Sequence, residues 1–142
     1  MSQDLMQSRE GSPNAYGPRL VFALVGIALA IHGAIHAMGV MLLLELGEPG
    51  DLTYAVARPE PGTTLAVLFA ALWALAAALF VAAGFLVFRG RPRVWMVVVA
   101  SVASLAAIAP MAAAAPVGFA ISLVTLTVGT WYSRRTSTLR LR

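Results

Sequence analysis

Two histidines, His32 and His36, are the only ionisable side chains that lie deep inside the apolar stretches of this sequence. Their i, i+4 spacing places both on one face of a helix. An imidazole surrounded by lipid must be neutral and hydrogen-bonded, because an unsatisfied polar group is costly there. The pair therefore requires polar partners, and its depth alone makes it the first functional hypothesis.

One chemistry open to this pair is metal binding. Two imidazoles one turn apart can share one ion, completed by nearby sulfur and oxygen ligands: Met38, Met41, Glu45 and Glu48. Glu45, however, lies nine residues beyond His36 and so points to the opposite side of an ideal helix. Two histidines on one helix face also cannot approach a haem iron from opposite sides. We therefore predict no cofactor, with His32 and His36 as the candidates if a metal binds.

The alternative is that both imidazoles bond hydroxyl groups on neighbouring helices and fasten the helices together. The candidate partners are the hydroxyl residues of the later apolar stretches: Ser101, Ser104, Ser122 and Thr125. Hydrogen bonds of this kind are worth about 1 kcal/mol or less in membrane proteins. We expect fastening ahead of a solute, proton or quinone site, and that site ahead of a metal or haem site.

Other catalytic patterns are missing from the sequence. The chain has no cysteine, which removes disulfides, thiolate metal sites and cysteine nucleophiles. Its serines have no accompanying base and acid, and it has no glycine-rich phosphate loop. The acidic segment 47–62 lacks the ligand spacing of an EF-hand. No catalytic residue is predicted, and an enzyme is not the expected class.

Composition indicates how these residues must be positioned. The 142 residues are 60% hydrophobic and 11% charged, against about 45–50% and 25% in soluble domains. This apolar surplus has to face lipid, so we predict one all-α domain, an integral membrane four-helix bundle. The predicted spans are residues 20–46, 63–88, 94–112 and 116–133.

One long uncharged stretch must contain the last two predicted spans. Residues 94–132 carry no charge, and one helix of that length would measure about 58 Å, roughly twice the hydrocarbon thickness. Pro110 and Pro116 bracket an alanine-rich middle, and proline breaks a helix interior but suits a first turn. We therefore predict a tight hairpin between these prolines.

Arginine placement predicts the orientation. Nine of the ten arginines lie in the tail 1–18 or just after it, in the turn 89–93, or in the tail 134–142. The exception is Arg58, in a segment with three acids. The positive-inside rule makes both termini cytoplasmic, with residues 1–18 a flexible tail, 19–133 the membrane domain and 134–142 a basic tail. The arginine- and alanine-rich composition indicates a bacterial plasma membrane, and arginines beside apolar spans do not indicate nucleic-acid binding.

Small residues recur on one face of each predicted span, where they would let backbones approach closely. The stripes are Gly26, Ala30, Gly33 and Ala37; Ala70, Ala74, Ala77 and Gly84; Ala100, Ser104 and Ala107; and Gly118, Ser122, Thr125 and Gly129. The first and last stripes are the most specific, because alanine is common throughout the chain.

The segment Ile31–Gly39 (IHGAIHAMG), the central Trp73 of the second span, the arginine turn and the segment Gly118–Ala120 (GFA) resemble a family of small, uncharacterised bacterial membrane proteins with four helices. The resemblance covers most of the apolar chain and neither tail. It implies the fold and the membrane location, and it transfers no activity. This sequence departs from the family where residues 110–116 replace a more polar hairpin.

The absence of a catalytic set makes an accessory or interaction component of the plasma membrane the expected function. Its partners would be the lipid bilayer, with another membrane protein or a second copy of the chain as the further candidates. Two alternatives stay open. One is an intramembrane solute, proton or quinone site around His32 and His36, and the other is a small metal- or haem-linked redox subunit.

Overall fold

The structure is a computed structural model that describes residues 16–48, 53 and 57–139. Its elements are α1 (Tyr16–Leu43), α2 (Thr64–Phe88), α3 (Val94–Ile108), the 3-10 turn η2 (Ala109–Met111) and α4 (Pro116–Leu139). No strand occurs in these ranges. The predicted all-α class is therefore confirmed.

Three helical segments are long and apolar enough to cross a membrane: Arg19–Leu43, Thr64–Phe88 and Val94–Met111. Their outward faces carry large apolar side chains, for example Leu24, Ile31 and Leu68, each more than half exposed. Such continuous apolar surface is rare on proteins that face water. α4 is not among the three; serines and threonines recur along it, and Arg134 and Arg135 lie in its C-terminal part.

Local signals explain where α1 and α2 meet their loop. α1 ends at Leu43 rather than at residue 46, because Glu45 has a positive φ of 57° and the Leu46 N–H bonds back to the Met41 carbonyl at 2.8 Å. α2 begins after Thr63, whose side chain accepts from the Ala66 N–H at 3.1 Å. It ends at Phe88, two residues before Gly90, whose φ of +68° is not helical.

The helices run further into the predicted tails than expected. α1 begins at Tyr16, inside the predicted flexible tail 1–18, whose residues 1–15 lie outside the described residues. Proline is tolerated in a first helical turn, so Pro18 does not delay the start of α1. α4 continues to Leu139 instead of ending at 133. The hairpin lies where predicted, with Pro110 in η2 and Pro116 opening α4.

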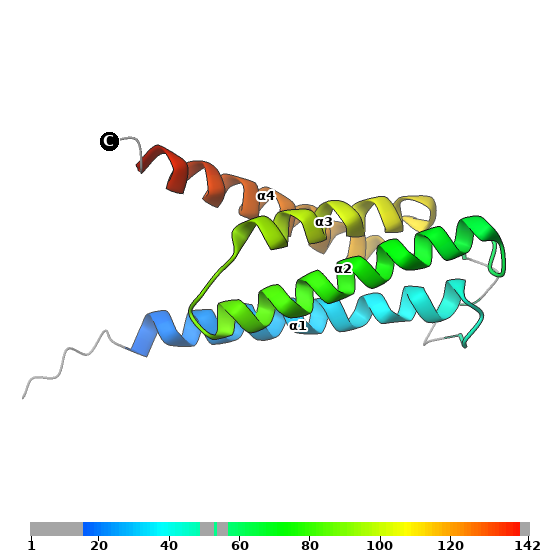
Figure 1. Ribbon diagram of the computed structural model, residues 1–142, viewed down its shortest axis with the longest axis horizontal. Coiled ribbons are helices and arrows are strands. Elements are labelled where there is room, and N and C mark those ends of the chain that lie inside the picture. The colour runs from blue at the N-terminus through cyan, green and yellow to red at the C-terminus, as the bar shows by residue number, and fades with distance from the viewer. Residues whose placement is uncertain (1–15, 49–52, 54–56, 140–142) are drawn as a thin grey trace, which may run out of the picture.

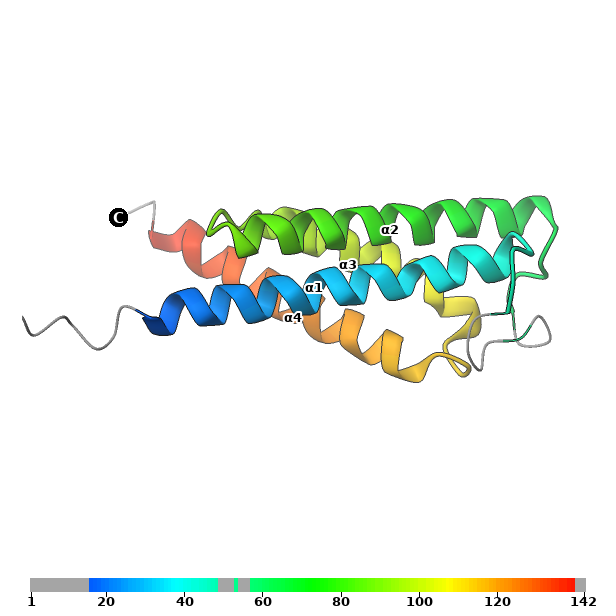
Figure 2. The ribbon, with the colours of Figure 1, turned by 90° about the horizontal axis from the view of Figure 1, so that it is seen from below.

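Consecutive helices run antiparallel and pack side by side (Figures 1 and 2). α2 packs on both α1 and α3, and α3 packs on α4, whereas the backbones of α1 and α4 are not in close contact. The start of α1, the α2–α3 turn and the C-terminal half of α4 lie at one end (Figure 1). The α1–α2 loop and the hairpin lie at the other.

α1 and α2 approach each other through glycine. A Cβ added to Gly84 would lie 2.5 Å from the Gly26 carbonyl oxygen, and one added to Gly33 would lie 2.9 Å from the Ala77 carbonyl oxygen. The predicted glycines of the first two stripes therefore lie at a helix interface.

Two alanines of the first two stripes do not lie at a helix interface. Ala37 and Ala74 are exposed, so their assignment to the packing face was wrong. The buried face of α2 is set instead by residues seven apart along the helix: Ala66, Trp73, Phe80 and Val87. Large side chains at this spacing fill the space between helices and turn Ala74 outward.

Candidate functional site

The two histidines lie on the inner face of α1, where His32 is 6% exposed and His36 1% exposed. The His32 Nε2 lies 3.3 Å from the Ser122 Oγ of α4, and the His36 Nε2 lies 2.6 Å from the Ser104 Oγ of α3. The two serine hydroxyls are 2.6 Å apart. One chain of hydrogen bonds thus joins α1 to α3 and α4, which follow it by more than fifty residues in the sequence.

The direction of this chain follows from one fixed acceptor. His36 Nδ1 lies 2.8 Å from the His32 carbonyl oxygen, which can only accept, so Nδ1 carries the proton. In a neutral ring the His36 Nε2 then accepts from the Ser104 hydroxyl. Ser104 accepts in turn from Ser122, and Ser122 accepts from the His32 Nε2–H. The tautomers are assigned from the hydrogen-bond partners.

Ser101 and Thr125 extend the network by one turn. Their hydroxyl oxygens are 2.9 Å apart, while Ser101 Oγ lies 2.8 Å from the Val97 carbonyl and Thr125 Oγ1 lies 3.0 Å from the Ser122 carbonyl. The structure thus brings all six predicted site residues into one connected group: His32, His36, Ser101, Ser104, Ser122 and Thr125.

Aromatic rings of α2 close the other side of the histidines. The Phe80 ring centroid lies 4.7 Å from that of His32, and the Trp73 centroid lies 5.1 Å from that of His36. The Trp73 ring packs directly on Gly39, where a Cβ would collide with it. Its Nε1 is the only buried side-chain nitrogen or oxygen without a partner in the described part of the chain.

These aromatic walls were not predicted, although the sequence carries a signal for them. Trp73 and Phe80 are seven residues apart, and Gly39 follows His36 by three, so each pair shares a helix face.

The His36 ring and the two serine hydroxyls find their hydrogen-bond partners within the protein. Both nitrogens of His36 are bonded, so an external ligand on that ring would have to displace Ser104 or the His32 carbonyl. Within the described ranges, no three His, Asp or Glu side chains converge. Glu45 and Glu48 lie beyond the last turn of α1, and the Glu45 carboxylate faces Gly62. The arrangement can fasten α1 to α3 and α4 without any added group.

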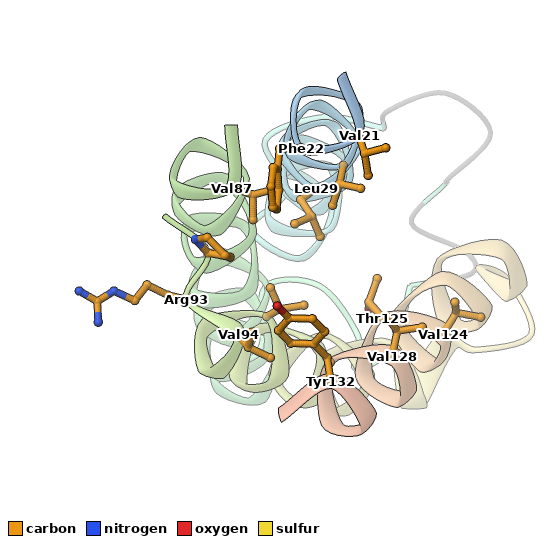
Figure 3. A pocket seen from close by; sticks show the side chains of 14 residues that line it. Val21, Phe22, Leu29, Val87, Arg93, Val94, Val124, Thr125, Val128 and Tyr132 are labelled. Carbon is orange, nitrogen blue, oxygen red and sulfur yellow. The ribbon is translucent and has the colours of Figure 1, made fainter. Parts of the chain in front are cut away.

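An apolar cavity of about 530 Å³ lies between α1 and α4, beside the network. In Figure 3, Val21, Phe22 and Leu29 line one side, and Val124, Val128 and Tyr132 line the other. Thr125 belongs to both the cavity wall and the hydrogen-bonded group. The sequence did not predict this cavity, because its volume depends on the distance between α1 and α4.

Neither a family model, nor a curated protein, nor a solved structure matches this chain. The resemblance based on Ile31–Gly39 therefore stays a prediction.

Proposed function

We propose that the protein is a four-span bundle of a bacterial plasma membrane, where it serves as an accessory or interaction component without chemistry of its own. The observation that supports this is the closed hydrogen-bond chain from His32 through Ser122 and Ser104 to His36. It uses the only deep ionisable groups of the membrane domain to join helices. Both nitrogens of His36 and the hydroxyls of Ser104 and Ser122 are engaged by protein partners, whereas a reaction site would keep such a group open for a ligand.

α4 is the fourth span in this proposal. Pro116 to Ser133 measures about 27 Å as a helix, close to the ~30 Å hydrocarbon core. Two of its threonine hydroxyls donate hydrogen bonds to backbone carbonyls one turn earlier. Thr127 donates to the Leu123 carbonyl at 2.8 Å, and Thr130 donates to the Leu126 carbonyl at 2.9 Å. These bonds lower the cost of placing threonine in lipid.

The charges support cytoplasmic termini. Arg19, the arginines of the turn 89–93 and Arg134 with Arg135 belong to segments that share one end of the molecule (Figure 1). The acidic residues that the structure describes all lie in the α1–α2 segment at the opposite end: Glu45, Glu48 and Glu60. Under the positive-inside rule the arginine end faces the cytoplasm.

Cysteine labelling tests the four-span topology directly, because the natural chain contains no cysteine. An impermeant maleimide on intact cells should label Thr53→Cys and Ala114→Cys, but not Gly90→Cys or a cysteine added after Arg142. All four should react once the membrane is permeabilised. Labelling at the added C-terminal cysteine of intact cells would show that α4 does not cross, and the reverse pattern overall would invert the orientation.

Absorption spectroscopy with metal and quinone analysis separates this proposal from its alternatives. The protein purified in mild detergent should show no visible band and no stoichiometric metal or quinone. A Soret band or about one metal per chain, lost in His36→Phe, would favour the redox subunit. A stoichiometric quinone lost in the same variant would favour the solute or quinone site.

A further inference from the structure

Two arginines at the basic end of the molecule share a depression. Arg19 of α1 and Arg89 after α2 line a space of about 380 Å³, together with Phe22 and Phe88. The Arg89 guanidinium lies 4.4 Å from the centre of the neighbouring Phe85 ring. No acidic residue of the described ranges forms an ion pair with Arg19 or Arg89, since those acids lie at the far end. Among the described residues, the depression is therefore positively charged with no acidic side chain to balance it.

The apolar cavity between α1 and α4 begins next to this depression, and Phe22 lines both. Along α1 it extends from Val21 to Leu29, which is about 12 Å of helix. One leaflet of the hydrocarbon core measures about 15 Å. Its volume of about 530 Å³ lies within the range of small-ligand pockets. The cavity therefore has the depth and the apolar surface suited to one acyl chain.

We propose that these two spaces form a single binding site for an anionic phospholipid. The phosphate lies against Arg19 and Arg89, and one acyl chain passes Phe22 into the cavity between α1 and α4. Guanidinium groups bind phosphate through charge-assisted hydrogen bonds, and basic surfaces at the cytoplasmic leaflet attract anionic headgroups. Arg93 also lines the cavity wall, but its guanidinium points away from the other lining side chains in Figure 3, so it is not assigned to the headgroup.

The position of the cavity favours a lipid over a partner helix. A helix seated between α1 and α4 would need an open seam through both leaflets, about 30 Å long. The cavity occupies only the half nearer the arginines, because deeper in the molecule His32 and His36 join α1 to α3 and α4. A neutral isoprenoid would fill the cavity equally well but would leave the paired arginines without a partner.

Native mass spectrometry of the full chain tests the site with dioleoyl phosphatidylglycerol as the anionic probe and dioleoyl phosphatidylcholine as the neutral one. The expected result is one tightly held phosphatidylglycerol per chain, bound at least about tenfold more strongly than phosphatidylcholine. The double variant Arg19→Gln/Arg89→Gln should remove this preference. Arg91→Gln is the matched control, because Arg91 lies in the same turn and lines neither space.

The acyl-chain half of the site has its own variants. Val128→Trp and Val25→Trp each place an indole in the cavity and should reduce phosphatidylglycerol binding at least about tenfold, whereas Val102→Trp, on an exposed face of α3, should not. Circular dichroism and monodisperse elution would verify that each variant folds.

Competition by millimolar inorganic phosphate would place free phosphate, not a lipid, at the arginines and would overturn the proposal. So would equal binding of the two lipids, or phosphatidylglycerol binding that survives both kinds of variant.

Discussion

Replacing Gly84 by alanine is expected to lower the free energy of unfolding by about 1–3 kcal/mol, although it adds only one methyl group. That methyl would lie 2.5 Å from the Gly26 carbonyl oxygen and 2.9 Å from the Ala30 backbone nitrogen. Both atoms belong to a helix backbone and cannot rotate away, so α1 and α2 must separate. In lipid, this separation loses the close packing that holds the two helices together.

The sign of the effect distinguishes a close backbone contact at Gly84 from a site with free space. Alanine favours a helix over glycine by about 1 kcal/mol, so a site with free space should gain stability. Gly118→Ala in α4 is the control, because its Cβ would meet only the Ile108 Cδ1 at an ordinary 3.5 Å. Thermal or denaturant unfolding in detergent should rank Gly118→Ala at or above the natural protein and Gly84→Ala below it. Equal stability of the two variants would contradict the close α1–α2 approach.

Replacing His36 by alanine is expected to lower the free energy of unfolding by about 2–3 kcal/mol. The side chain is 1% exposed and bonds Ser104 at 2.6 Å, while its ring packs near Phe80 and Trp73. Alanine therefore removes a hydrogen bond and also leaves a cavity. The value of about 1 kcal/mol or less predicted from sequence applies to the bond alone, because the burial of the ring was not visible there.

A double-mutant cycle separates the bond from the packing. His36→Phe keeps most of the ring volume and removes the bond to Ser104, and Ser104→Ala removes the other partner. The cycle should give a coupling energy of about 0.6–1.7 kcal/mol in detergent or bicelles. Zero coupling would mean that the two groups are not bonded in the folded protein. Thr127→Ala, whose hydroxyl bonds only the Leu123 carbonyl of its own helix, should show no coupling to His36→Phe.

The linear chain was sufficient to predict the helices, both ends of α2 and the starts of α3 and α4. Apolar runs longer than a bilayer crossing, ended by arginine, glycine or proline, are local signals that need no knowledge of the neighbours. Pro110 and Pro116 marked the hairpin for the same reason. The i, i+4 spacing of His32 and His36 likewise placed both rings on one face before any partner was known.

The pairing of those histidines depended on tertiary structure. That His36 meets Ser104 while His32 meets Ser122 follows from the relative rotation and depth of α1, α3 and α4. Rotation is set by large side chains such as Phe80 and by backbone contact at Gly84, which involve residues more than forty positions apart in the chain. The cavity has the same origin, because its volume depends on the distance between α1 and α4, which pack less closely than consecutive helices. A one-dimensional pattern records which face of a helix is apolar or small, but the partner of that face is fixed only when all four helices pack together.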